Sequence, residues 1–331
     1  MKTLYWWLIL LAVTIAYPLL LGGMSPYQST VLILIGIYVI LAMSLDLLVG
    51  YSGQISLGHA AFFAIGAYTS GILCARYAAE PIVALFLGMC FSGAISWIIG
   101  WSVLSLRGYY LAMATLGLTV ITHTLIVGLQ SLTGGASGLA DIPSFRLAGF
   151  EFTNHVHYYY FVWVVVLLVL GACLTLVNSP FGRTLNAIHS DETAAATVGV
   201  DCAKYKVSIF VVSNMFAALA GSLYAHHMSF IAPDDFSVFT SIHILIMIYL
   251  GGVGTILGPA IGAVFLKLLP ELTYRFHDYE LLGNGAILIL VLVFMPHGIY
   301  GALRAGGKRI KDKCFKRRLS EGQRLLDTNN G

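Results

Sequence analysis

The chain has 331 residues, of which 58% are hydrophobic and only 10% are charged, whereas soluble domains carry about 25% charged residues. With a mean hydropathy of +0.85, too few charged side chains are available to cover a soluble surface, which excludes a cytosolic enzyme. The composition also excludes a nucleic-acid-binding protein, despite a net charge of +3, and a disordered chain. An all-α polytopic membrane protein remains.

Long uncharged stretches predict about ten transmembrane helices, because about 20 apolar residues cross a hydrocarbon core ~30 Å thick. The first stretch lacks the short apolar core and cleavage site of a signal peptide, so we interpret it as a span. The run 236–266 is interrupted by glycines and a proline and divides into two short spans. The expected spans are 5–24, 31–50, 57–75, 82–105, 109–129, 158–177, 207–228, 238–250, 255–270 and 281–300.

Charge placement predicts the orientation. Residues 304–331 hold nine Lys/Arg and three Asp/Glu, so we expect a basic cytoplasmic tail that meets anionic membrane lipid, following a transmembrane domain at 1–303. Four spans separate this tail from the loop 178–206, which is then cytoplasmic as well, and the N-terminus also lies inside. Neither the five cysteines nor the ten histidines have metal-ligand spacing, so we expect no metal site.

The loop 178–206 holds six charged residues out of 29 and is predicted to contain a short helix outside the membrane. Ser190 suits the N-cap, Asp191 and Glu192 fall in the first turn, and Gly199 ends the helix. A helix of about two turns is not stable alone. It must therefore dock on its own protein or on a cytoplasmic partner.

Polar residues inside apolar spans are candidates for a substrate pathway. The segment 50–59 joins two spans and is rich in glycine and polar side chains; such backbone lines a watery cavity in a transporter, or is a turn at the cytoplasmic interface. Three roles are open for the intramembrane carboxylate Asp46. It could pair with a neighbouring helix, line a substrate pathway, or extend its side chain to the membrane–water interface. The candidates are Asp46, Gln54, Ser56, His59, Thr115 and Thr119, and all of them are equally compatible with helix packing.

Two stripes of small residues recur every four positions and favour close helix packing. They are Ala217, Gly221 and Ala225, and Gly254, Gly258 and Gly262.

Two other classes of function are compatible with parts of the sequence. An ion-driven secondary transporter would use Asp46 as its proton site. An intramembrane serine protease would use Ser52, which lies in a four-residue Gly-x-Ser-Gly match, but no His-x-x-x-Asn element accompanies it.

Several collinear segments together resemble the LivH/LivM permeases of branched-chain amino acid ABC importers over roughly residues 40–300, with the LivM branch the more similar. Urea permeases share much of the pattern. The segments are GYSGQISLGHAAFFAIGAYTSG (50–71), LRGYYLAMATLGLTVI (106–121), TGGASGLADIP (133–143), SPFGRTLNAIHSDETAAATVGV (179–200), KYKVSIFVVSNMFAALAGSLYA (204–225) and LGGVGTILGPAIGA (250–263).

The resemblance implies the ABC importer permease fold and a subunit of the bacterial inner membrane that is not itself an enzyme. Its partners would be a LivH-like permease subunit, two cytoplasmic ABC ATPase subunits (LivG/LivF-like) and a periplasmic substrate-binding protein, with no nucleic acid. ATP would be used by the partner subunits and no cofactor bound directly, in agreement with the lack of a Walker A motif. The substrate would be branched-chain amino acids or, alternatively, urea or a short amide.

In this family the loop 178–206 contains the coupling helix that docks on the ATPase. Gly182, Arg183, Ala195 and Gly199 match the family motif, and Asp191 and Glu192 lie between them. Glu192 lies one place earlier than the general E-A-A-x-x-x-G spacing of ABC permeases. The family often has Asn where this chain has Asp46.

Overall fold

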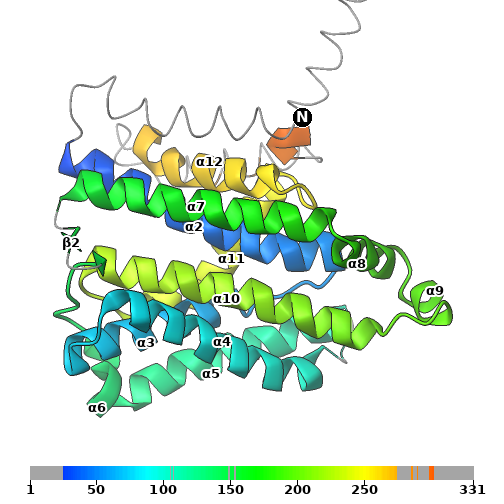
Figure 1. Ribbon diagram of the computed structural model, residues 1–331, viewed down its shortest axis with the longest axis horizontal. Helices are drawn as coiled ribbons and strands as arrows, with labels where there is room; N and C mark the ends of the chain where they lie inside the picture. The colour runs from blue at the N-terminus through cyan, green and yellow to red at the C-terminus, as the bar shows by residue number, and fades with distance from the viewer. Residues whose placement is uncertain are drawn as a thin grey trace, which may run out of the picture.

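The computed structural model describes residues 25–273, except positions 105, 107, 148, 149 and 153, together with 285, 289 and 298–301. The expected span 5–24, most of the span 281–300 and the basic tail 304–331 lie outside these residues. Elements carry the numbers of Figure 1. In chain order they are α2 (Pro26–Ser52), α3 (His59–Tyr77), α4 (Pro81–Val103), α5 (Tyr109–Gly128), α6 (Gln130–Thr133), η1 (Gly135–Ser137), β1 (Arg146–Leu147), β2 (Phe150–Glu151), α7 (His155–Asn178), α8 (Pro180–Ser190), α9 (Glu192–Thr197), α10 (Cys202–Met228), η2 (Pro233–Phe236), α11 (Val238–Gly251) and α12 (Leu257–Thr273).

Eight of the ten expected spans coincide with helices, which are α2 to α5, α7 and α10 to α12. Five of them, α2, α4, α5, α7 and α10, are long and apolar enough to cross a membrane by length and composition. The antiparallel pair β1–β2 is only two residues long on each side. These findings confirm the prediction of an all-α polytopic membrane protein.

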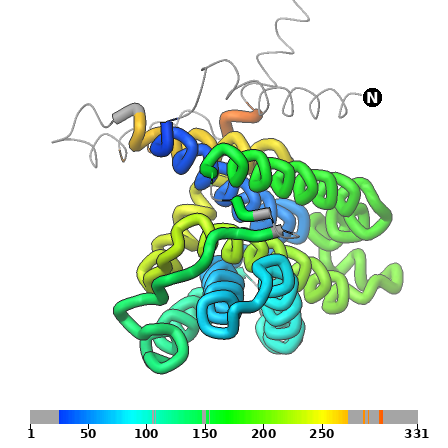
Figure 2. Tube along the Cα trace, turned by 60° about the vertical axis from the view of Figure 1, so that its left-hand side comes forward, coloured from blue at the N-terminus to red at the C-terminus, as the bar shows by residue number. Residues whose placement is uncertain are grey.

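Helix α10 lies at the centre of the described bundle, where it packs against α2, α3 and α4. On the other side of the bundle, α2 also packs against α7 and α12, as the turned view in Figure 2 shows. Phe62 and Phe210 are fully buried where α3 meets α10, and their rings meet edge to face with centroids 5.6 Å apart. Such aromatic pairs stabilise packing beyond the area that they bury.

Small residues let the backbones of α3 and α10 approach closely. A Cβ atom on Gly221 would lie 2.0 Å from the carbonyl oxygen of Phe63, and one on Gly66 would lie 2.1 Å from that of Ala218. Ala217 and Ala225 are fully buried on α10. The first small-residue stripe therefore lies in a helix contact that has no room for a larger side chain.

The second stripe is divided between a turn and a helix. Gly258 and Gly262 belong to α12 and pack against Gly251 and Met247 of α11, so the two short helices run antiparallel. Gly254 instead lies in the turn at residues 252–256, with φ of +73°. The prediction that Gly254 belongs to this packing stripe is therefore wrong, because α12 begins only at Leu257.

Gly221→Ala should destabilise the protein, because the new methyl group overlaps the Phe63 carbonyl and overpacking costs about 1–3 kcal/mol. Gly117→Ala is the matched control, since nothing lies within 4 Å of that position on α5, and both changes alter helix propensity equally. The measurement is the midpoint at which purified protein in detergent loses monodispersity on heating. We expect a lower midpoint for Gly221→Ala alone, and equal midpoints for the two variants would contradict the packing described.

Candidate functional site

The helical backbone breaks twice near the end of α2. The first break, the α2–α3 linker, covers residues 53–58, and the second, the α11–α12 turn, covers residues 252–256. The two breaks lie side by side, because a Cβ atom on Gly50 would lie 2.5 Å from the backbone nitrogen of Gly254. Backbone groups released from helices in a membrane need other partners. Most of the predicted polar residues lie around these breaks.

Two threonines of α5 hold the α2–α3 linker. The Thr115 hydroxyl oxygen accepts a hydrogen bond from the backbone N–H of Leu57 (3.0 Å), and the Thr119 hydroxyl donates to the carbonyl of Leu57 (2.8 Å). Ser241 of α11 similarly accepts from the N–H of Ala60 at the start of α3 (3.0 Å). These side chains thus satisfy backbone groups of the broken segment, and both threonines are buried.

The other polar residues of this linker differ in their partners. The Nε2 atom of His59 lies 2.7 Å from the hydroxyl oxygen of Ser44 on α2, and the Ser56 hydroxyl accepts from the N–H of Gly58 (3.2 Å). The amide of Gln54 is only 4% exposed, and neither its oxygen nor its nitrogen has a hydrogen-bond partner in the described part of the chain. Both polar atoms of Gln54 are thus without a partner among the described residues, and so is the Nδ1 atom of His59.

Asp46 anchors the α11–α12 turn. Its Oδ1 atom accepts a hydrogen bond from the backbone N–H of Gly254 (2.9 Å), and the residue is only 1% exposed. Gly50, one turn further along α2, leaves the space that this contact needs, since a Cβ atom there would lie 2.5 Å from the same Oδ1 atom. Of the three positions considered from the sequence, Asp46 occupies the one that binds a neighbouring element.

The loop 178–206 folds into two short helices, α8 and α9, rather than one. The sequence carries a signal for α8, because Ser179 accepts a hydrogen bond from the N–H of Gly182 (3.4 Å) and Pro180 takes the first helical position. The prediction of Ser190 as N-cap is wrong, since it is the last residue of α8. Asp191 caps α9 instead.

The Asp191 cap has a clear physical reason. Its Oδ1 atom accepts from the backbone N–H groups of Thr193 (2.9 Å) and Ala194 (3.0 Å), and a carboxylate at a helix start is a stronger acceptor than a hydroxyl. Gly199 follows α9 with φ of +86°, so it does lie at the predicted end of the helix.

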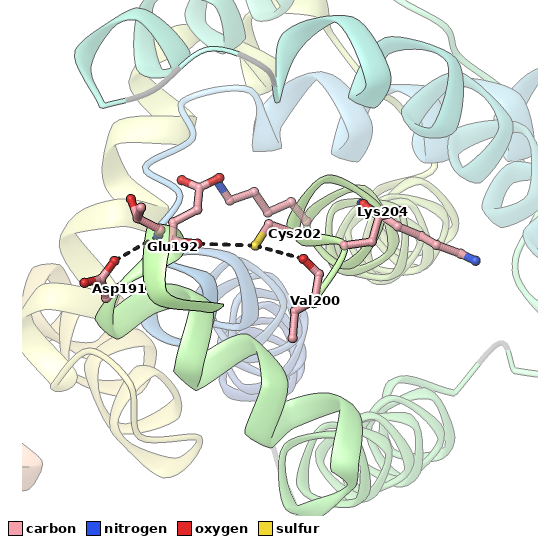
Figure 3. Close-up of polar contacts among 8 residues, drawn as sticks. Asp191, Glu192, Val200, Cys202 and Lys204 are labelled. Carbon is pink, nitrogen blue, oxygen red and sulfur yellow. Dashed lines mark hydrogen bonds and ion pairs between the residues drawn. The ribbon is translucent and has the colours of Figure 1, made fainter. Parts of the chain in front are cut away.

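Helix α9 is fixed to the start of α10 by an ion pair and a small core. The Lys206 ammonium lies 2.7 Å from the Glu192 carboxylate, with side-chain exposures of 10% and 29%. The Cys202 thiol lies between the backbone carbonyls of Glu192 and Val200, each 3.6 Å away (Figure 3). Ala195 packs beside Cys202 in the same small core. This end of the bundle therefore holds α9 in a defined position.

The predicted coupling residues divide into supporting and exposed positions. Gly182 and Ala195 are buried, and a Cβ atom on Gly182 would lie 2.2 Å from the carbonyl oxygen of Val177. Arg183, Asp191 and Gly199 are exposed. Val198, which the sequence analysis did not select, is 80% exposed at the tip of the loop. The loop thus presents a mixed polar and apolar surface away from the bundle.

His189 joins this loop to the helix breaks and was missed in the sequence analysis. Its Nδ1 atom lies 3.1 Å from the carbonyl oxygen of Gly50. Its ring also lies against Gly53, where a Cβ atom would come 3.3 Å from the ring and the left-handed backbone (φ +68°) favours glycine. No local pattern signals this contact, because the two residues are 139 positions apart.

The structure gives no support to a serine nucleophile or a metal centre among the described residues. Ser52, the residue of the protease hypothesis, is buried and donates its hydroxyl to the carbonyl of Leu48 (2.7 Å) within α2. Among the residues that the structure describes, no group of three or more His, Cys, Asp or Glu side chains could hold a metal ion. The site does contain a continuous series of contacts from His189 of α8 through the end of α2 to Gly254 in the α11–α12 turn.

Comparison with known proteins identifies the family. The family model described as "Branched-chain amino acid transport system / permease component" matches residues 27–295. The chain belongs to this family, and it is an integral membrane permease subunit of an ABC importer and not an enzyme.

The relatives of this chain include permease subunits named LivM and LivH. The chain is 32% identical to the high-affinity branched-chain amino acid transport system permease protein LivM of Salmonella typhimurium, covering 88% of this chain and 73% of that protein. It is 31% identical to LivM of Escherichia coli K12 with the same coverage, and 26% identical to LivH of that strain, over 80% of this chain and 91% of LivH. No solved structure matches the chain. The predicted resemblance is confirmed, and the chain is a LivM-type permease.

Asp46→Ala should weaken the protein by about 1–3 kcal/mol, because it leaves the buried N–H of Gly254 without a partner. Asp46→Asn keeps an oxygen acceptor and is the matched control. Transport by the assembled complex and protease resistance of the region around residue 254 measure the effect. We expect both to fall for Asp46→Ala and to be largely retained for Asp46→Asn. Equal loss in both variants would show that the negative charge itself is needed, as a proton site requires.

Proposed function

We propose that this chain is one permease half of an ATP-driven importer in the bacterial inner membrane. Its partners are a LivH-like permease, two ABC ATPases (LivG/LivF-like) that use the ATP, and a periplasmic binding protein. The observation that carries the proposal is the pair of short helices α8 and α9, called here the α8–α9 platform, which stands at one end of the bundle and contacts the end of α2 through His189. The LivM and LivH names of the relatives support the permease pair.

The proposed orientation puts α8 and α9 in the cytoplasm and the β1–β2 end in the periplasm. Figure 1 shows these elements at opposite ends of the long helices. The basic tail at 304–331 supports this orientation, because positive residues favour the cytoplasmic side. Both termini are then cytoplasmic.

The proposed coupling surface consists of Arg183, Asp191, Val198 and Gly199. When the ATPases close, they move α8 and α9, and the His189 contact carries that movement to the end of α2. From there the Gly50–Gly254 contact and the Asp46 hydrogen bond pass it to the α11–α12 turn. Alternating access then results from repacking of these elements, while Gly182, Ala195 and the Glu192–Lys206 pair keep the platform rigid.

Branched-chain amino acids are the proposed substrates, as the names of the LivM and LivH relatives suggest. Gln54 is the best pathway candidate of the six polar residues, because its buried amide has no partner among the described residues. In our proposal Ser56, His59, Thr115 and Thr119 shape the linker beside that path. Urea or a short amide is the alternative cargo. It would be distinguished by which solute the complete complex accumulates.

Arg183→Glu and Gly199→Pro should uncouple ATP hydrolysis from uptake in the complex reconstituted from this chain, the LivH-like permease, the two ATPases and the binding protein. The charge reversal disturbs the docking surface, and proline cannot adopt the positive φ of Gly199. We expect at least a tenfold fall in leucine accumulated per ATP hydrolysed, with normal membrane insertion.

Arg146→Glu is the control, because it reverses a charge at the opposite end and breaks only the exposed Arg146–Glu151 pair. This variant should keep the ratio of leucine to ATP. An unchanged ratio in the two loop variants would remove the coupling assignment. Uptake without ATP would remove the proposed function itself.

A further inference from the structure

A cavity of about 360 Å³ lies between α2, α11 and α12. Among the described residues, Thr240 and His243 of α11, Lys267 of α12 and Tyr38 of α2 provide its polar groups. Ile246, Met247 and Leu266 provide apolar walls. This volume is in the range of small-molecule sites, about 300–1,000 Å³, and the mixture of apolar walls with a few polar groups is typical of them.

Lys267 is the notable group in this cavity, because it is a cation inside a helix bundle. Its ammonium lies over the ring of Tyr38, 3.5 Å from the centroid. Within the described part of the chain, no carboxylate lies at ion-pair distance from it. Glu271, one helical turn away, accepts a hydrogen bond from the hydroxyl of Tyr27 (2.6 Å). A lysine at such a position is costly to retain and points to a ligand or a path.

The cavity lies in the part of the bundle where a ligand would enter from the periplasm in the proposed orientation. Thr240 and His243 lie near the start of α11, and Lys267 lies near the end of α12. These helix ends lie away from the α8–α9 platform. In the proposed orientation the cavity therefore occupies the periplasmic half of the bundle.

We propose that Lys267 and this cavity form a binding site for a small aliphatic amino acid, with Lys267 holding the carboxylate. The apolar walls formed by Ile246, Met247 and Leu266 receive the branched side chain, and the Thr240 hydroxyl offers an acceptor for the ammonium group. This inference rests on the proposed function and adds to it the residues that recognise the substrate. An anionic lipid headgroup fits less well, because lipid sites gather several basic residues and the described lining of this cavity has one lysine and no arginine.

Lys267→Gln and Lys267→Arg test the site in the reconstituted complex. We expect Lys267→Gln to lower leucine uptake at least tenfold, while the complex still assembles with the ATPases and the binding protein. Lys267→Arg keeps the charge and should retain most of the uptake. Equal uptake by Lys267→Gln and the wild-type complex would overturn the inference. Failure of the wild-type complex to accumulate leucine with ATP would instead count against the proposed function.

Occupancy of the cavity by leucine can also be measured directly. A purely structural role of Lys267 would not affect this measurement. Ile246→Cys, in a background without the natural cysteines, places a thiol in the cavity. Millimolar leucine should slow its reaction with a small thiol reagent, whereas leucinol, which lacks the carboxylate, should not. Adding Lys267→Gln should abolish the difference. Equal protection by leucine and leucinol, or protection that depends only on anionic lipid in the vesicles, would contradict an amino acid site.

Discussion

Where a transmembrane helix breaks, its backbone N–H and C=O groups need new partners, because the hydrocarbon core offers none. This constraint accounts for several of the buried polar residues in the centre of the protein. Thr115 and Thr119 bond the backbone of the α2–α3 linker, and Asp46 bonds that of the α11–α12 turn. Residues that look like a substrate path in the sequence therefore first serve to hold two irregular segments in place.

In the proposed function, the two breaks are the part of the bundle that responds to movement of the ATPases. Both lie beside the end of α2, where glycines allow backbones to touch, and His189 of α8 reaches the same point. Helices packed along their full length resist relative movement, whereas a short hydrogen-bonded turn has few contacts to rearrange. The structure thus places its irregular backbone next to the platform on which we propose the ATPases act.

The sequence was sufficient for the fold class, because hydropathy reports helices of membrane length directly. Local signals also located the end of α9 at Gly199. The contacts of the candidate site could not be predicted from the sequence, since Asp46 and Gly254 are 208 positions apart and no pattern joins them. The error at Ser190 has a different cause. Ser190 and Asp191 are adjacent and either side chain can accept hydrogen bonds at a helix start, but it is the Asp191 carboxylate that caps α9. Helix α8 was missed although Ser179 and Pro180 are typical of a helix start.

The account depends most on the side of the membrane that the α8–α9 platform faces. Thr193→Cys, in a background without the natural cysteines, places a thiol on this exposed surface, and Glu151→Cys marks the opposite end. Vesicles of known orientation are treated with a maleimide that cannot cross the membrane. We predict that position 193 reacts only in inside-out vesicles and position 151 only in right-side-out vesicles. Reaction of position 193 from the outside would contradict the account, because cytoplasmic ATPases could not reach the platform.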